Sequence, residues 1–363
     1  MEFQEITKMI LDLSKIIPKN IYTKSGNKTY RLHISYQGER ILIANPKDKH
    51  HDIWYPQHIT VPPGKICVWY SWPAGRNQSK VGNCGKRYNY LLIPRFLPLD
   101  KLTMNALGLL QAEMTRGELR KSTLSFTNSE PNLINVVMEF FKGFKIEPLD
   151  WSWNITFNYK LKEYEDLQQT SRRELESESF WHINTSINQN NKGNKIIFYT
   201  GNKKYRNMRK GTMQFGSLKI NHSDIILYQL IRNLLEEIKN MVSIETSSHY
   251  LQGIFAGEGC VQPTVFGSLD NVNVGAVVKE DQLFFAKCLE LLNISCSLAP
   301  TYIKIHNLKN FLKIYHYNLL ELHPVRHKKF LTCLSQFKQI PQELKAEYYF
   351  IREKVIIDVG KMV

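Results

Sequence analysis

Hydrophobic positions follow two different spacings along this 363-residue chain. Apolar residues that recur every three or four positions share one face of a helix, whereas alternating ones share one face of a strand. The helical spacing predicts helices over residues 5–17, 131–141, 224–241, 281–292, 309–320 and 325–337. The alternating spacing predicts strands over residues 30–43, 66–72, 123–127, 153–159, 196–199, 212–220, 260–266, 272–278 and 297–305.

The order helix, strands, helix, strands, helix therefore occurs twice in the later part of the chain. Residues 1–100 have no counterpart elsewhere, and their alternating stretches predict a β-rich extension with a hairpin across Gly38. Residues 160–179 are rich in charge and Gln, and residues 188–194 in Asn, so both are predicted to be loops. The predicted division is 1–100 for the N-terminal extension, 101–242 and 243–340 for two units, and 341–363 for a C-terminal helical tail.

A short apolar segment occurs twice, once in each unit. The two copies are Ala106-Leu-Gly-Leu-Leu-Gln-Ala-Glu113 and Leu251-Gln-Gly-Ile-Phe-Ala-Gly-Glu258. Each contains two small residues four positions apart, and these are Gly108 with Ala112 and Gly253 with Gly257. On a helix such positions form a strip without side-chain bulk, so two helices can cross closely there. The crossing would bring the two terminal glutamates together.

Two carboxylates at adjacent helix C-termini are unfavourable on their own. They face the negative ends of both helix dipoles, and they repel each other. A bound divalent cation removes both objections, and Mg²⁺ prefers hard oxygen ligands, keeps several waters and accepts phosphate oxygens. Glu113 and Glu258 are therefore candidate metal ligands for chemistry at a phosphodiester. The alternative for either copy is a buried amphipathic helix that ends in a solvated acid.

The two segments resemble the LAGLIDADG motif of homing endonucleases, and the resemblance covers roughly residues 102–337. The second copy, with Gly259 after it, fits the nine-residue pattern well. The first departs from it, because Met114 stands where the family usually has glycine. Both metal-binding positions carry Glu where Asp is commoner. The resemblance is to single-chain members with two motifs, which implies a monomer with internal pseudo-two-fold symmetry.

The resemblance implies an α+β fold of two pseudo-symmetric αββαββα units that pack through their motif helices. In the family, both sheets lie in the major groove of double-stranded DNA. The implied activity is cleavage of both strands at a long asymmetric site, with Mg²⁺ or Mn²⁺ held by Glu113 and Glu258. The stretch between Glu113 and the next predicted helix is short, so the opening hairpin of the first unit is expected to be reduced to one strand.

Further site residues are implied by the same resemblance. In the family, a lysine before the last helix of each unit sits near the scissile phosphate, and Lys219 and Lys304 occupy that place here. In some members a polar residue after the strand that precedes the middle helix positions water, and the candidates here are Asn128 and Lys279. Each of these four residues has an ordinary surface role as its alternative.

The charge balance adds a partner to this picture. The formal net charge is +15 and the isoelectric point is near 9.4, which favours a polyanion such as nucleic acid over other partners. One basic stretch interleaves with tyrosine and is a candidate phosphate-contacting loop, with a solvated turn as its alternative. Its basic residues are Lys203, Lys204, Arg206, Arg209 and Lys210.

Other classes of protein find less support in the sequence. The six cysteines and eleven histidines show no zinc-site spacing, and no run of apolar residues is long enough to cross a membrane. The chain does not start with a secretion signal, so we expect an intracellular protein, either cytoplasmic or organellar. Three alternatives remain beside a nuclease of intron or intein mobility. They are a DNA-binding regulator that does not cleave, a maturase that acts on intron RNA, and an unrelated α/β protein.

Overall fold

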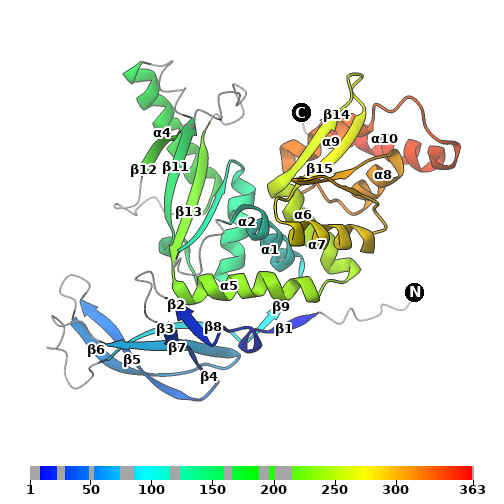
Figure 1. Ribbon diagram of the computed structural model, residues 1–363. Coiled ribbons are helices and arrows are strands. Elements are labelled where there is room, and N and C mark those ends of the chain that lie inside the picture. The colour runs from blue at the N-terminus through cyan, green and yellow to red at the C-terminus, as the bar shows by residue number, and fades with distance from the viewer. Residues whose placement is uncertain are drawn as a thin grey trace.

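The computed structural model describes residues 9–22, 29–48, 53–73, 86–114, 123–158, 166–187, 196–200 and 215–361. Helices dominate the part after residue 100, and they are α1 (Lys101–Glu113), α2 (Pro131–Lys142), α4 (Leu167–Asn184), α5 (Ile225–Glu237), α6 (Ile244–Glu258), α7 (Lys279–Leu291), α8 (Leu308–His316), α9 (Pro324–Leu334) and α10 (Lys345–Lys361). Figure 1 shows α1 and α6 between two β-sheets, with α5 running beneath them. The two central helices pack directly against each other.

Each central helix begins at a side-chain cap and ends at a glutamate. The Asp100 carboxylate accepts a hydrogen bond from the Thr103 backbone N–H at 2.9 Å, and Ser243 forms a reciprocal capping box at the start of α6. The chain leaves both helices in an extended conformation, with φ −66° at Met114 and −72° at Gly259. Neither value lies in the left-handed region, so the backbone angle does not demand glycine and Met114 leaves the helix exit unchanged.

The two sheets flank the central helices, and three strands of each follow the same order. The first sheet has the order β10 (Thr123–Asn128), β13 (Ser217–Ser223), β11 (Ser152–Asn158), β12 (Ile196–Thr200). The second has the order β14 (Gly259–Pro263), β15 (Leu269–Gly275), β17 (Tyr302–Ile305), β16 (Ser297–Leu298). In both sheets the strand before the middle helix, β10 or β15, pairs with the last strand of the unit, β13 or β17. That last strand also pairs with a strand that lies between the two in sequence, β11 or β16. Only β11 and β12 pair in parallel among these described strands.

The N-terminal part is built from short β-sheets that lie below α5 in Figure 1. Its strands are β1 (Ile10–Asp12) paired with β9 (Phe96–Pro98), β2 (Asn20–Tyr22) with β3 (Thr29–Arg31), β5 (Arg40–Asp48) with β6 (Ile53–Thr60), and the sheet of β4 (His33–Ser35), β7 (Lys65–Pro73) and β8 (Lys86–Pro94). One hydrophobic core runs from this part through both units to α10. The Asn233 amide of α5 also donates a hydrogen bond to the Ile16 carbonyl at 2.8 Å. The N-terminal part is therefore packed onto the first unit.

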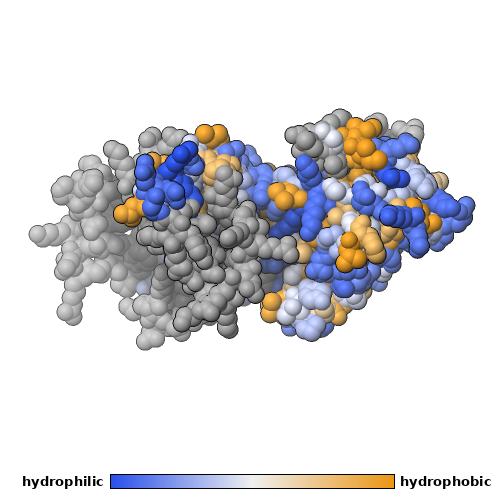
Figure 2. Space-filling view, turned by 90° about the horizontal axis from the view of Figure 1, so that it is seen from above, coloured by the Kyte–Doolittle hydropathy of each residue, from blue (hydrophilic) through white to orange (hydrophobic). Residues whose placement is uncertain are grey.

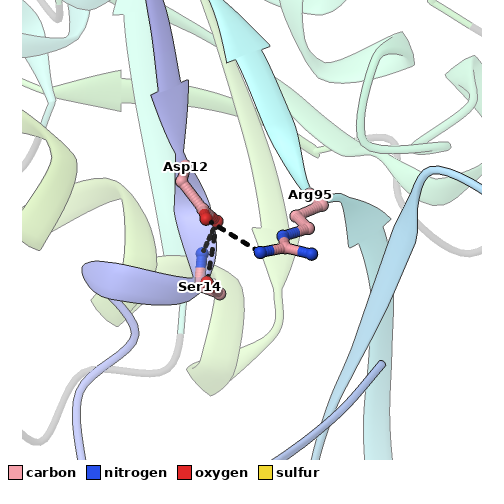
Figure 3. Close-up of polar contacts among 3 residues, drawn as sticks. All are labelled: Asp12, Ser14 and Arg95. Carbon is pink, nitrogen blue, oxygen red and sulfur yellow. Dashed lines mark hydrogen bonds and ion pairs between the residues drawn. The ribbon is translucent and has the colours of Figure 1, made fainter. Parts of the chain in front are cut away.

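A polar contact fastens the start of the chain to the segment before α1. The Asp12 carboxylate accepts hydrogen bonds from the backbone N–H and the hydroxyl of Ser14, at 3.1 and 2.7 Å, and so caps a short 3₁₀ turn (Figure 3). The Arg95 guanidinium lies 3.3 Å from the other oxygen of Asp12. Because Arg95 stands between β8 and β9, this ion pair links β1 to the strand that leads into the first central helix.

Three predictions of local structure are wrong, two of them in the N-terminal part. The described part of the predicted helix 5–17 contains β1 and a 3₁₀ turn, because Ile10–Asp12 pairs with β9 instead of continuing a helix. Residues 30–43 do not form a hairpin across Gly38, since β4 pairs with β7 and β5 with β6. Pairing with distant strands overrides the local pattern in both cases.

The third wrong prediction concerns residues 160–179, where helix α4 begins at Leu167 instead of a loop continuing. Its buried positions are Thr170, Ser177 and Trp181, of which two are polar. The Ser177 hydroxyl and the Trp181 indole both donate hydrogen bonds to the Phe215 carbonyl, at 2.6 and 2.9 Å. A helix that packs through polar side chains leaves no apolar period in the sequence, which is why the pattern failed to reveal it.

Candidate active site at the helix crossing

The crossing of α1 and α6 depends on two glycines that face each other. A Cβ atom on Gly108 would collide with the Tyr250 carbonyl and would lie 3.0 Å from the Gly253 Cα. A Cβ atom on Gly253 would collide in turn with the Asn105 carbonyl and would lie 2.7 Å from the Leu109 nitrogen. Every one of these neighbours is backbone, which cannot move away as a side chain can. The close approach that was predicted from the small residues is therefore present at both glycines.

The same contact continues one turn later and reaches the first glutamate. A Cβ atom on Gly257 would lie 2.5 Å from the Ala112 Cβ and 3.2 Å from the Glu113 Cγ. The Glu113 Oε1 lies 3.7 Å from that same position. Since Gly257 immediately precedes Glu258, the structure brings the ends of the two motif helices, and with them the two glutamates, into one place.

The two carboxylates have unlike surroundings. Glu113 is partly buried, and burial raises its pKa to about 7, helped by the negative charge of Glu258 and opposed by Arg326. Glu258 is exposed at the mouth of a pocket, and a Cβ atom on Gly275 would lie 2.6 Å from its Oε2. Gly275 thus leaves the room in which the Glu258 carboxylate lies.

An arginine from outside the repeated elements reaches this pair. Arg326 lies in the first turn of α9, and its Nη1 donates hydrogen bonds to the carbonyls of Phe255 and Ala256 at the end of α6. Burial lowers its pKa from the usual value, while Glu113, Glu258 and a third acid, Glu130, act in the opposite direction. An arginine keeps its charge in proteins. A permanent positive charge therefore stands among three carboxylates at the helix crossing.

A pocket of about 350 Å³ opens beside Glu258 on the face of the second sheet. It is lined by Glu258, Cys260, Gln262, Asn273, Gly275, Thr301, Tyr302 and Lys304. Lys304 is flanked across the sheet by Asn273 and Ser297. The Oδ1 atom of Asn273 is buried and has no hydrogen-bond partner. The pocket thus combines a carboxylate, a lysine and an unsatisfied acceptor, which suits a polar ligand with donor groups.

The corresponding lysine of the first unit occupies the same register. Lys219 on β13 is flanked by Thr127 of β10 and Asn154 of β11, just as Lys304 is flanked in the second sheet. Both lysines alternate with buried neighbours, so each points away from the core of its sheet. Lys304 shares a pocket with Glu258, which fits the place expected for it near the carboxylates.

The remaining predicted residues have other described surroundings or lie outside the described residues. The Asn128 side chain accepts a hydrogen bond from the Glu130 backbone N–H at 3.0 Å, so it shapes the turn before α2. Lys279 is exposed in the first turn of α7. The five candidates Lys203, Lys204, Arg206, Arg209 and Lys210 lie outside the described residues.

Sequence reasoning missed Arg326, Glu130 and Gly275. The Arg326 side chain belongs to a segment that was predicted only as a helix, and nothing in its spacing connects it with the motif glutamates. Glu130 lies between β10 and α2, where a single acid is common. Gly275 carried a weak signal, because a glycine inside a strand often marks a close approach of another group.

The residues at the crossing fit a hard divalent cation whose coordination is completed by water and by a substrate. The residues at the crossing offer carboxylate oxygens, the ligands that Mg²⁺ and Mn²⁺ prefer. Burial and the negative charge of Glu258 raise the pKa of Glu113, so a positive charge nearby favours its ionised form. Within the described residues, no group of three or more His, Cys, Asp or Glu side chains forms a complete metal site. Waters and phosphate oxygens would have to complete the coordination.

The described surface is mostly hydrophilic on the side seen from above, with apolar residues in small separate groups (Figure 2). Val265 and Phe266, between β14 and β15, are 95% and 82% exposed. No described helix is both long and apolar enough to span a membrane. A polar partner suits this surface better than an extended apolar one.

Comparison with known proteins gives structural neighbours only. No family model matches the sequence, and no curated protein matches it. A solved structure of I-DmoI in complex with DNA and Mn is similar, with 12% identity, a TM-score of 0.35, and coverage of 61% of this chain and 98% of that one. The N-terminal LAGLIDADG domain of DUF199/WhiA is similar with 10% identity, a TM-score of 0.32, and coverage of 61% and 85%.

Full-length DUF199/WhiA from Thermatoga maritima is also similar, with 11% identity, a TM-score of 0.34, and coverage of 71% of this chain and 67% of that one. A LAGLIDADG domain is thus among the solved structures to which this chain is similar.

Proposed function

We propose that this chain is a divalent-metal-dependent endonuclease that cuts both strands of double-stranded DNA at a long asymmetric site. One observation carries the proposal, namely that Glu113 and Glu258 meet at the ends of two helices held together by Gly108 and Gly253. Such a meeting is unfavourable without a cation. The net charge of +15 and the I-DmoI structure solved with DNA and Mn support the same interpretation.

In this proposal the chain itself supplies position and charge. Glu113 and Glu258 would hold Mg²⁺ or Mn²⁺, which when bound activates water and stabilises the departing oxygen of a phosphodiester. Lys304, in the pocket beside Glu258, would orient a phosphate oxygen and offset its negative charge. Lys219 would act in the same way at the other strand, from the equivalent register of the first sheet.

The same proposal includes the organisation of the whole molecule. Two units, 101–242 and 243–340, would be related by a pseudo-two-fold axis through the helix crossing, and the matching strand orders support this. Their sheets would lie along the DNA, with the N-terminal part as an extension of the first unit. The molecule would act as a monomer in an intracellular compartment, as part of intron or intein mobility.

The experiment is cleavage of a random double-stranded DNA library with and without Mg²⁺. We expect cutting at a rare site that disappears in Glu113→Gln and in Glu258→Gln, by a factor of about 1,000 or more, while DNA affinity stays within roughly tenfold. Glu237→Gln, at the end of α5, is the matched control, and it should cut normally. Persistent cutting by either motif variant would refute the assignment of the carboxylates.

A second candidate is a DNA-binding protein of this fold that does not cleave. It is favoured by Arg326, whose fixed charge beside the two glutamates could make a metal unnecessary. The cleavage experiment separates the two candidates, because a regulator would bind DNA but leave it uncut both with and without Mg²⁺. No observation in the described residues favours intron RNA over DNA as the partner.

A further inference from the structure

Arg326 lies at the candidate site, although neither of the two motif segments contains it. It belongs to α9, which follows α8 late in the second unit, and it reaches back to the end of the motif helix α6. Its surroundings combine carbonyl oxygens and carboxylates from both units. A guanidinium so placed needs an explanation, because burying a charge is costly unless it is paired and hydrogen-bonded.

We propose that Arg326 is the resident counter-cation of the paired glutamates, a positioning residue that keeps Glu113 and Glu258 side by side when no metal is bound. The inference rests on the proposed function, since it concerns the same two carboxylates. It adds that the site is preformed, so that a divalent cation and a phosphate meet two carboxylates that are already in position at the helix crossing.

The hydrogen bonds of Arg326 fix the end of the second motif helix. Its Nη1 lies 2.8 Å from the Phe255 carbonyl and also contacts the Ala256 carbonyl. These groups belong to the last turn of α6, where the helix dipole is negative, and the Phe255 carbonyl also accepts a hydrogen bond from the Gly259 backbone N–H. The guanidinium adds a bond to each of the two carbonyls and offsets the dipole, two and three residues before Glu258.

The charges around Arg326 tie it to the first unit as well. Glu113 from α1 and Glu130 from the turn before α2 both favour its charged form. The segment before α9 is anchored on the same side, because the Asn132 amide donates a hydrogen bond to the Leu322 carbonyl at 2.6 Å. Arg326 therefore holds backbone from one unit and faces acids from the other.

This arrangement explains how two glutamates can sit together in a metal-free protein. Removing one partner of a buried charged group is strongly destabilising, because the remaining charges lose their compensation. Without Arg326, the repulsion between Glu113 and Glu258 would act at the crossing itself, where the glycine contacts leave no room for adjustment. A bound cation would then contribute to stability as well as to chemistry.

The test is a double-mutant cycle in thermal unfolding, measured in EDTA on the full chain. We expect Arg326→Met to lower Tm by roughly 6 °C, and to lower it by less than half as much when Glu113→Gln is already present. Arg326→Lys, which keeps the charge, should recover at least half of the loss. Lys329→Met, an exposed lysine on the same helix, is the control and should change Tm by about 1 °C or less.

An equal loss of Tm in both backgrounds would overturn the proposal, because Arg326 would then only pack. If Arg326→Met alone does not fold, the double variant with Glu113→Gln is expected to fold. If neither variant folds, the proposal is overturned as well. A second arm adds Ca²⁺ without DNA, which should raise the Tm of Arg326→Met more than that of the unchanged protein. If Ca²⁺ shifts neither protein, the proposed metal site fails, while the cycle in EDTA still decides the role of Arg326.

Discussion

The two units differ most in the elements that come after their motif helices. After Glu258 the chain enters the two-strand hairpin β14–β15, and the outer face of this sheet carries the pocket with Lys304. After Glu113 only β10 is described before α2, so the described part of the first hairpin is a single strand. The first sheet instead gains β12, which pairs in parallel at its opposite edge. The centre of the sheet is alike in the two units, and its edges are not.

This difference extends to the carboxylates. Glu113 is partly buried against the end of α6, whereas Glu258 is exposed in its pocket. A shared helix crossing therefore places two chemically identical groups in unequal electrostatic surroundings. The helix crossing thus determines the position of both glutamates, while the sheet after each helix determines how exposed its glutamate is. Three further experiments probe this division between shared crossing and separate surroundings.

The largest effect is expected at the crossing, where the two units are alike. Gly108→Ala and Gly253→Ala should each reduce the free energy of unfolding by about 3 kcal/mol or more, because each new Cβ meets backbone of the partner helix. Denaturant unfolding measures the loss. Gly360→Ala is the control, since nothing lies within 4 Å of a Cβ there and alanine favours the helix α10. Unequal losses at Gly108 and Gly253 would break the equivalence of the two motif helices.

The next effect separates the two carboxylates by their response to pH. The folded pKa of Glu113 is raised to about 7, so the folded state holds a proton more tightly than the unfolded state does. The stabilisation from this proton is fully present below the unfolded pKa of about 4.3, and it is lost as pH rises through 7. Metal-free protein should therefore lose up to about 3 kcal/mol between pH 4.5 and 8 from this group, and partial exposure reduces that limit.

The measurement is urea unfolding in EDTA at several pH values, for the unchanged protein and for both glutamine variants. Glu113→Gln should flatten the profile between pH 4.5 and 8, whereas Glu258→Gln should flatten it only in part, through the lost repulsion. The same profile for both variants would contradict the unequal surroundings of the two acids. Adding Mg²⁺ should also flatten the profile, because the cation competes with the proton for Glu113.

The helix crossing, which the two units share, was predicted from the sequence better than the surroundings of each glutamate. Glycine, alanine and glutamate at fixed helical spacing were enough to predict the crossing and the meeting of the acids, because that contact depends on residues within two short segments. The single described strand after Glu113 was also expected from the short stretch before the next helix. Local patterns predicted most helices after residue 100 for the same reason.

The parts that escaped prediction depend on contacts between distant residues. Strand β1 pairs with β9, and α4 packs through polar side chains, so neither left a local hydrophobic period. Arg326 reaches the end of α6 from a position about seventy residues after Glu258, and no spacing rule joins those two residues. The basic stretch 203–210 lies outside the described residues, so its role stays a prediction.

The smallest expected change in stability concerns Gly275, which belongs only to the second unit. A Cβ there would lie 2.6 Å from the Glu258 Oε2, at the far end of a flexible side chain that can move aside. Gly275→Ala should therefore cost about 1 kcal/mol or less in unfolding free energy, yet displace the carboxylate from the pocket. We expect cleavage to fall by roughly 100-fold, in line with a misplaced group at a catalytic centre.

The outcome distinguishes a catalytic carboxylate from a structural one at this position. Cleavage and DNA affinity should be measured together with urea unfolding, and Gly360→Ala again serves as the control that should change none of the three. Normal cleavage by Gly275→Ala would mean that Glu258 acts from another orientation or does not act at all. A large loss of stability would instead mean that the strand, and not the carboxylate, needs the glycine. Because the new methyl group meets Glu258 before any backbone atom, loss of cleavage with normal folding is the expected result.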